Sequence, residues 1–467
     1  MAGGLWTSEA RRTQPGALVS QCAAMQPATS FDVRHFIDER PVGSYQLRVA
    51  ALCSLIVFVD GFDAQAMGYV APALSSAMAI PRSVLGPVIS SGLVGMMIGA
   101  LVSGPLADQL GRRPVLIGCV LIFGVGSLLT ATAQSVEMLT VFRALTGLGM
   151  GGAMPNAIAL TSEYMPRRRR GTAVTTMICG FSLGAAVGGF VAASIIPRFG
   201  WQSVFIVGGL APIVIAAAAL VWLPDSIRFL LVRGGRDERA RGYLQQIAPG
   251  AALPPALSAG SDEGEGRGAF VVKQLFERRR AVGTLLIWTV YFMNLLNLYF
   301  LNSWLPTIIS DADIPVETAI RLTALFQVGG IGGALVLGAL LDRYFSFWVL
   351  AGCYLWAAVC VFFIGSSGAS TLMLGITITS AGLGIIGGQN ASHALSAAFY
   401  PTAIRSTGVG WALGIGRIGS IVGPVLGGLL LARGTPIGQV FWAAAIPALI
   451  ATTAAAGIAL MGRGDPE

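Results

Sequence analysis

Two aspartates lie inside a long apolar stretch of the sequence, "SLIVFVDGFDAQAMGYVAPAL" (54–74). Asp60 and Asp63 are three residues apart, so they lie on roughly one face of a helix. A charged residue at the centre of a bilayer costs about 2.5–3.5 kcal/mol, and charges kept there usually face a cavity and carry out a function. Burial and the neighbouring negative charge both oppose ionisation, so at least one aspartate is expected to hold a proton near neutral pH. This pattern predicts a proton-coupling site; the alternative is a structural pair bonded to other helices.

Two arginines also lie within apolar stretches. Arg143 lies about six residues inside one end of its stretch, at a depth that can match Asp63, so it is the expected counter-charge. The alternative is that its side chain extends outward to the membrane interface. Arg417, in "GIGRIGSIVG", lies about 18 Å along a helix from Arg405. Its planar guanidinium suits bidentate binding of a carboxylate, and the alternative is a permanent pair with Asp60 or Asp63.

The composition indicates a membrane protein. Of the 467 residues, 54% are hydrophobic and only 11% are charged, and the mean hydropathy is +0.73. Soluble domains carry about 25% charged residues, whereas apolar windows of about 20 residues are what a helical membrane protein requires. We therefore expect an all-α polytopic membrane protein with twelve transmembrane helices. The expected spans are 47–74, 84–107, 114–133, 138–161, 171–196, 201–223, 281–304, 318–341, 346–366, 369–394, 406–431 and 437–461.

A polar stretch divides the twelve windows into two sets of six. The expected parts are an N-terminal tail (1–46), a six-helix bundle (47–223), a central loop (224–280), a second six-helix bundle (281–461) and a C-terminal tail (462–467). The central loop is expected to begin with short surface helices and to continue as a flexible linker.

The placement of basic residues predicts that both termini are cytoplasmic. Positive charge stays on the cytoplasmic side, and all but six of the 30 Lys and Arg residues fall there if the N-terminus is inside. Four of those six, Arg82, Arg198, Arg321 and Arg433, lie outside, and the other two are the arginines within spans. The net charge of +8 comes from the cytoplasmic loops, so no nucleic-acid partner is expected.

Cysteine and histidine usage gives no sign of a cofactor. The six cysteines are dispersed and show no paired spacing, so neither disulfides nor metal clusters are expected. Only two histidines occur, His35 in the tail and His393 near the end of a span, which disfavours a zinc or haem site. The only coupling ion that we expect is the proton.

The two halves repeat each other in three places. "GPLADQLGRR" (104–113), after span two, matches "GALLDRY" (338–344), after span eight. "YMPRRRRGT", after span four, shares its Pro, Arg and Thr with "FYPTAIRSTG", after span ten. "GFSLGAAVGG" (180–189) shares a glycine pattern with "GSIVGPVLGG" (419–428). Three matches in the same order predict a duplicated six-helix unit, which is typical of transporters whose substrate site lies between the halves.

Several of these segments resemble a known family. "GPLADQLGRRP" is similar to the loop signature of the major facilitator superfamily, and "RALTGLGMGG" (143–152) to its fourth-span motif. "FIDERPVGSYQLRV", "DGFDAQAMGYVAPAL" and "YPTAIRSTGVGWALGIGRIGSIVGP" resemble the aromatic acid:proton symporter family within it. The resemblance runs from about residue 31 to the end. It implies a monomeric transporter with two six-helix halves in the bacterial inner membrane. It also adds Glu163, near the inner end of span four, to the proton-coupling residues Asp60, Asp63 and Arg143; the alternative for Glu163 is a carboxylate that faces the loop.

The loop signature predicts a cytoplasmic gate. Gly104 is expected to let span two approach a neighbouring helix, and Asp108 to pair with Arg112, Arg113 or a facing helix end. The alternative is a loop that only fixes topology. The residues expected to form the gate are Gly104, Asp108, Gly111, Arg112, Arg113, Asp342, Arg343 and Arg405. The second copy of the signature, at Asp342 and Arg343, lacks the Gly-Arg-Arg found in the first copy at 111–113.

A substrate with an aromatic ring also needs aromatic and polar walls. The residues expected to bind substrate are Arg417, Tyr291, Asn294, Gln389, Asn390 and Trp411. Span seven also offers Trp288, Asn297, Tyr299 and Trp304, although aromatic residues at helix ends are typical of interfacial belts.

The expected function is uptake of a small aromatic carboxylate, such as a hydroxybenzoate, by proton symport through alternating access. One alternative is an exporter or antiporter of another organic anion or a drug. The export motif of span five usually carries Pro at the position of Ala185, which argues against this alternative. Another alternative is a transport-like sensor. A sensor should carry an extra signalling domain, and no segment of this chain is large enough for one. No catalytic constellation favours an enzyme.

Overall fold

Long helices make up nearly all of the structure, a computed structural model. It describes residues 31–232, 237–251, 257–258, 274–277, 280–344, 346–366, 370–401 and 404–461. The first 30 residues of the expected N-terminal tail, most of the expected linker and the C-terminal tail lie outside the described residues.

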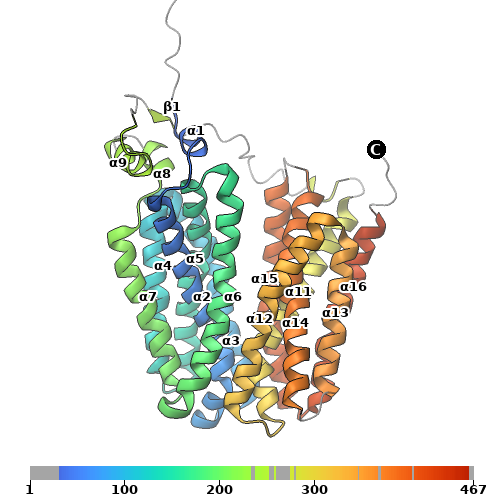
Figure 1. Ribbon diagram of the computed structural model, residues 1–467. Helices are drawn as coiled ribbons and strands as arrows, with labels where there is room; N and C mark the ends of the chain where they lie inside the picture. Colours follow the sequence, from blue (N-terminus) through green and yellow to red (C-terminus); the bar gives the residue numbers. More distant parts are fainter. Residues whose placement is uncertain are drawn as a thin grey trace, which may run out of the picture.

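Two sets of six long helices follow each other along the chain, and this confirms the predicted all-α architecture (Figure 1). The first set is α2 (Ser44–Met78), α3 (Arg82–Leu110), α4 (Arg112–Ala131), α5 (Val136–Tyr164), α6 (Arg167–Phe199) and α7 (Gln202–Trp222). The second set is α11 (Arg280–Ser310), α12 (Val316–Arg343), α13 (Phe347–Ser366), α14 (Thr371–Phe399), α15 (Arg405–Ala432) and α16 (Ile437–Met461). Each set packs as one bundle, called here the first half and the second half.

The apolar character of these helices explains why they form. Inside a bilayer every backbone N–H and C=O must find its partner within the protein, and a helix provides those bonds within one segment. Among the described residues, ten helices are long and apolar enough to cross a membrane. The two other long helices, α2 and α5, carry Asp60, Asp63 and Arg143, which lower their apolar content.

Short elements cover one end of the first half. They are β1 (Phe31–Asp32), α1 (Val33–Asp38), α8 (Ile227–Val232), α9 (Asp237–Ile247) and β2 (Leu257–Ser258), and β1 pairs with β2 in parallel. The helices α8 and α9 are the short helices expected at the start of the central loop. We call this end of the molecule the α9 end, and the opposite end the Arg82 end (Figure 1).

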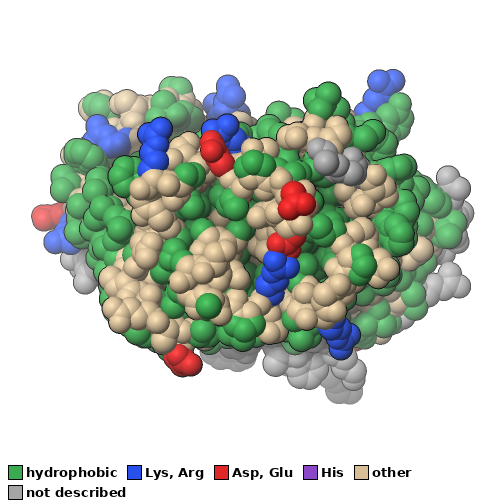
Figure 2. All heavy atoms as spheres, turned by 90° about the horizontal axis from the view of Figure 1, so that it is seen from below, with side chains coloured by type: hydrophobic (Ala, Val, Ile, Leu, Met, Phe, Trp, Pro, Cys, Tyr) green, Lys and Arg blue, Asp and Glu red, His purple; other side chains and the backbone are tan. Residues whose placement is uncertain are grey.

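The two halves contact each other at the Arg82 end. Arg82 of α3 pairs with Asp311, just after α11, at 2.5 Å between Nη2 and Oδ1. Ser90 Oγ donates a hydrogen bond to the carbonyl oxygen of Ile421 on α15 at 2.7 Å. Figure 2 shows this end as a continuous surface across both halves, with charged side chains near its middle.

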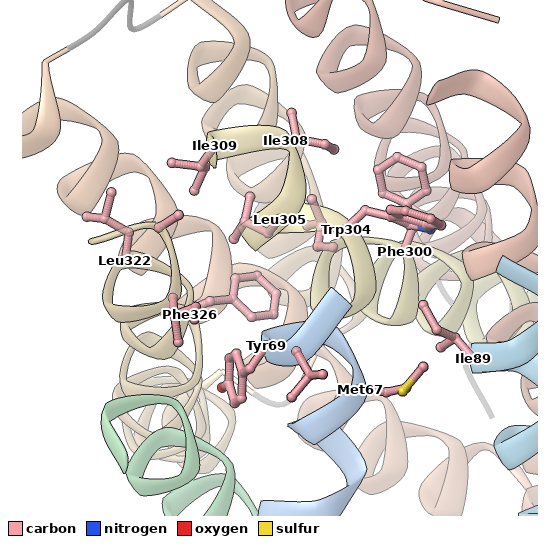
Figure 3. Packing of buried hydrophobic residues seen from close by; sticks show 14 of the residues in the cluster. Met67, Tyr69, Ile89, Phe300, Trp304, Leu305, Ile308, Ile309, Leu322 and Phe326 are labelled. Atoms are coloured by element: carbon pink, nitrogen blue, oxygen red, sulfur yellow. The ribbon is translucent and has the colours of Figure 1, made fainter. Parts of the chain in front are cut away.

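A hydrophobic cluster lies behind these polar contacts and crosses from one half to the other. Met67, Tyr69 and Ile89 of the first half belong to the same cluster as Trp304 and Phe326 of the second (Figure 3). Tyr69 and Trp304 are fully buried, and Trp304 Nε1 donates to the carbonyl oxygen of Pro424 at 2.8 Å. Burial of large aromatic side chains therefore closes the Arg82 end.

At the α9 end the bundles stand apart (Figure 1), and a hollow of about 950 Å³ runs along α2 and α6. Its wall includes Ala50, Ser54 and Thr176. Positions three to four apart share a helix face, so Ala50 and Ser54 lie on the same side of α2 as Gly68. At Gly68 this side of α2 meets α11, because an added Cβ there would contact the carbonyl oxygen of Asn302. Side-chain contacts thus join the halves at the Arg82 end, whereas at the α9 end the bundles stand apart and the hollow lies along the first half.

Two glycines of α3 test the packing of the first half. Gly99 lies against the backbone of Leu148 on α5, whereas nothing lies within 4 Å of the position where Gly104 would carry a Cβ. We expect Gly99→Val to lower the melting temperature of the purified protein in detergent, because the helix backbones must separate. Gly104→Ala is the control and should leave it unchanged; equal melting temperatures for the two variants would contradict this packing.

Candidate functional site

A buried ion pair joins α2 to α5 inside the first half, as the sequence predicts. Arg143 Nη1 lies 3.0 Å from Asp63 Oδ2, and the two side chains are 5% and 0% exposed. Asp63 Oδ1 also accepts a hydrogen bond from Ser127 Oγ of α4 at 2.8 Å. Arg143 therefore does not extend to the membrane interface, and the charge of Asp63 is compensated within its own half.

Asp60 lies one turn away and is buried without such compensation. It is 1% exposed, and neither carboxylate oxygen has a hydrogen-bond partner among the residues that the structure describes. The charged groups that act on it are Asp63, which repels a second negative charge, and Arg417, which attracts it. An isolated ionised carboxylate is costly in such a place, so Asp60 needs either a proton or a positive charge close by.

Arg417 lies on α15 of the second half. Its Nη1 donates a hydrogen bond to Tyr299 Oη of α11 at 3.4 Å. Within the described part of the chain it forms no ion pair with a carboxylate, which excludes the permanent pair with Asp60 or Asp63 in this conformation. Gly416 lets α15 approach α11 closely, since an added Cβ there would lie 3.3 Å from Tyr291 Cβ. The Arg417 guanidinium is thus available to an anion.

A small cavity lies between the halves beside these charges. Arg143 and Gln65 line it from the first half, and Tyr299 and Asn302 from the second. Its volume of about 20 Å³ has room for a single water molecule. The cavity therefore lies between Arg143, one member of the buried pair, and Tyr299, which accepts the hydrogen bond from Arg417.

A hydrogen-bonded network lies farther towards the α9 end, between α11 and α14. Asn294 Nδ2 donates to Gln389 Oε1 at 2.5 Å, and Gln389 Nε2 lies 3.1 Å from His393 Nε2. Tyr291 Oη lies 3.0 Å from His393 Nδ1. Three predicted substrate-binding residues are therefore brought together, and His393 was missed because a lone histidine near the end of a span gives no pattern.

Two other predicted substrate-binding residues lie near this network. Asn390 is exposed on α14, next to Gln389. Trp411 is stacked on Trp288, with ring centroids 5.9 Å apart and 19° between the planes. Since both tryptophans lie near the ends of their helices, this stack is found at the α9 end of the second half.

Glu163 lies in the last turn of α5, at the inner end of span four where the sequence places it. It forms an ion pair with Arg112 at the α9 end of the first half. Arg143 is twenty residues away on the same helix, which corresponds to about 30 Å. The structure therefore groups Glu163 with the predicted gate and not with Asp60 and Asp63.

The predicted gate is only partly assembled. Asp108 is exposed and forms no ion pair with the described residues, because Arg112 pairs with Glu163 and Arg113 lies 3.7 Å from Asp225. Gly104 makes no close helix contact, contrary to expectation, since this end of α3 is exposed.

The remaining gate residues have local roles in this conformation. Gly111 adopts φ +96° at the turn between α3 and α4, a conformation that favours glycine. In the second half, Asp342 and Arg343 are exposed, with Arg343 over the Tyr344 ring at 5.3 Å. Arg405 donates to the carbonyl oxygen of Tyr400 at 3.4 Å.

The buried pair predicts strong coupling between its two members. Removing one partner leaves the other charge buried and should cost about 3–5 kcal/mol, so Asp63→Asn and Arg143→Gln should each lower the melting temperature in detergent. The double variant should lose less than the sum of the two. The exposed pair Arg82 and Asp311 is the control, for which neutral variants should cost about 0–1 kcal/mol. Additive losses for Asp63→Asn and Arg143→Gln would contradict a direct pair.

Comparison with known proteins agrees with this architecture. The chain is 44% identical to the 4-hydroxybenzoate transporter PcaK of Pseudomonas putida, over 93% of this chain and 97% of that protein. It is 39% identical to the gallate transporter of the same organism, over 93% of this chain and 95% of that protein. These relatives confirm the resemblance to the aromatic acid:proton symporter family that the motifs indicate.

The fold is also similar to that of the xylose transporter XylE from E. coli in a partially occluded inward open conformation. The TM-score is 0.66 at 16% identity, and the match covers 91% of this chain and 99% of that chain. The family model described as the Major Facilitator Superfamily matches residues 53–391 and 287–467. The chain therefore belongs to the Major Facilitator Superfamily and is a transporter, not an enzyme.

Proposed function

We propose that this transporter takes up a small aromatic carboxylate, such as a hydroxybenzoate, together with a proton. It does so as a monomer in a bacterial inner membrane, with both termini in the cytoplasm. Relatives named for 4-hydroxybenzoate and gallate, which share nearly the whole length of the chain, support this substrate class. The placement of the arginines supports the orientation.

The observation that carries the proposal is the unequal pairing of four charges, the buried Asp60, Asp63 and Arg143 and the half-buried Arg417. Asp63 and Arg143 neutralise each other at 3.0 Å. Asp60 and Arg417, from opposite halves, are left without an ion pair among the described residues, although they act on each other electrostatically. One negative and one positive group are therefore free to exchange partners.

The exchange couples the proton to the substrate. When no substrate is bound, the positive charge of Arg417 stabilises an ionised Asp60. A substrate carboxylate that binds Arg417 removes this stabilisation, and a proton on Asp60 then restores neutrality. A carboxylate that enters with one proton moves no net charge, and so avoids the cost of about 2.3 kcal/mol per 100 mV for each charge that crosses against the membrane potential.

Alternating access follows from the unequal ends of the molecule. With the predicted orientation, the hollow at the α9 end opens to the cytoplasm, and this conformation is inward-facing. The similar XylE structure was also solved in an inward open conformation. The outward-facing state then requires Arg82 to part from Asp311, and the exposed residues Gly104 and Asp108 to contact the second half.

Loss of the Asp60 carboxylate should abolish proton-driven accumulation of substrate and leave substrate binding intact. We expect Asp60→Asn, reconstituted in vesicles, to lose accumulation of labelled 4-hydroxybenzoate driven by a pH gradient, because no proton can leave the site. Counterflow of the same substrate, which needs no proton cycle, should persist. Asp313→Asn makes the same chemical change at an exposed position and should accumulate substrate like the unaltered protein.

Two results would refute the proposal. Accumulation by Asp60→Asn at the unaltered level would show that Asp60 is not the coupling residue. Absence of 4-hydroxybenzoate and benzoate counterflow in the unaltered protein, with folding verified, would show that the substrate class is wrong.

A further inference from the structure

The network between α11 and α14 has a defined direction. Asn294 donates to Gln389, so the Gln389 amide nitrogen donates to His393 Nε2. This leaves Nε2 as the acceptor of the ring, and Nδ1 carries the proton and donates to Tyr291 Oη. His393 is thus a neutral imidazole, and among the described residues its acceptor nitrogen is bonded to the Gln389 side-chain amide.

One edge of the network is accessible from outside the core of the second half. Tyr291 and Asn294 are buried, whereas His393 and Gln389 are half-buried and Asn390 and Ala394 beside them are exposed. Residues three to four apart share a helix face, so Asn390, His393 and Ala394 form one accessible strip of α14. A ligand can therefore reach the bond between Gln389 and His393 along this strip without entering the core of the second half.

Arg417 and the network lie at different depths along α11. Arg417 is held by Tyr299, five residues after Asn294 on α11, which corresponds to about 7.5 Å along the helix. Polar groups are thus offered at two depths, as a ring with polar substituents at opposite positions requires. A carboxylate bound at Arg417 can therefore place a hydroxyl on the opposite ring carbon near Gln389 and His393.

We infer that His393 and Gln389 recognise the ring hydroxyl opposite the substrate's carboxylate, an inference that rests on the proposed function. The hydroxyl enters the bond between the two residues. It accepts a hydrogen bond from the Gln389 amide and donates one to His393 Nε2, so every donor and acceptor keeps a partner. Benzoate leaves the original bond in place and gains nothing there, which gives selectivity for the hydroxylated acid.

Calorimetric binding of 4-hydroxybenzoate and benzoate to the purified protein tests this assignment. The unaltered protein should prefer 4-hydroxybenzoate, and His393→Phe and Gln389→Leu should each reduce the ratio of the two affinities about tenfold, the effect of about one hydrogen bond. His393→Gln, which keeps a neutral acceptor, should retain part of the preference. Gln246→Leu, the same chemical change at an exposed position of α9, should retain all of it.

Three results would overturn the inference. They are no preference in the unaltered protein, an unchanged ratio in both His393→Phe and Gln389→Leu, or an equal loss of both acids, which indicates a structural role. Each is distinct from failure of the proposed function, in which the unaltered protein binds neither acid.

Discussion

The buried pair between Asp63 and Arg143 is the constraint on which the site depends. It fixes α2 against α5 and neutralises one of two carboxylates that lie a single helical turn apart. A second ionised carboxylate beside this pair has no counter-charge in its own half, so Asp60 depends on Arg417 across the boundary between the halves. The electrostatic state of one half is therefore linked to the position and occupancy of the other.

The packing between the halves gives this link a mechanical consequence. At the Arg82 end, large aromatic side chains such as Tyr69 and Trp304 and the hydrogen bond of Ser90 hold the halves together. At the α9 end no comparable cluster joins them in the described structure, and a hollow remains. The buried charges lie between these two ends. A bound anion and a proton can there shift the equilibrium between two relative positions of the halves.

Much of the architecture could be predicted from the sequence, and the limits have physical causes. Apolar windows and the duplicated segments predict twelve helices because the bilayer leaves few alternatives, and depth along a helix suffices to pair Arg143 with Asp63. Depth along a helix does not say which helices are neighbours. The sequence therefore could not predict that Arg112 pairs with Glu163 and not with Asp108. His393 was missed for a similar reason, since its role comes from contacts with α11.

The central claim is that Asp60 and the substrate's carboxylate compete for Arg417, and calorimetric binding of 4-hydroxybenzoate over a series of pH values tests it most directly. An ionised Asp60 competes with the ligand, so the affinity should fall as the pH rises through the range in which Asp60 loses its proton. Asp60→Asn should bind with an affinity that is constant over that range. An affinity of the unaltered protein that does not change with pH, or a fall that persists in Asp60→Asn, would contradict the account.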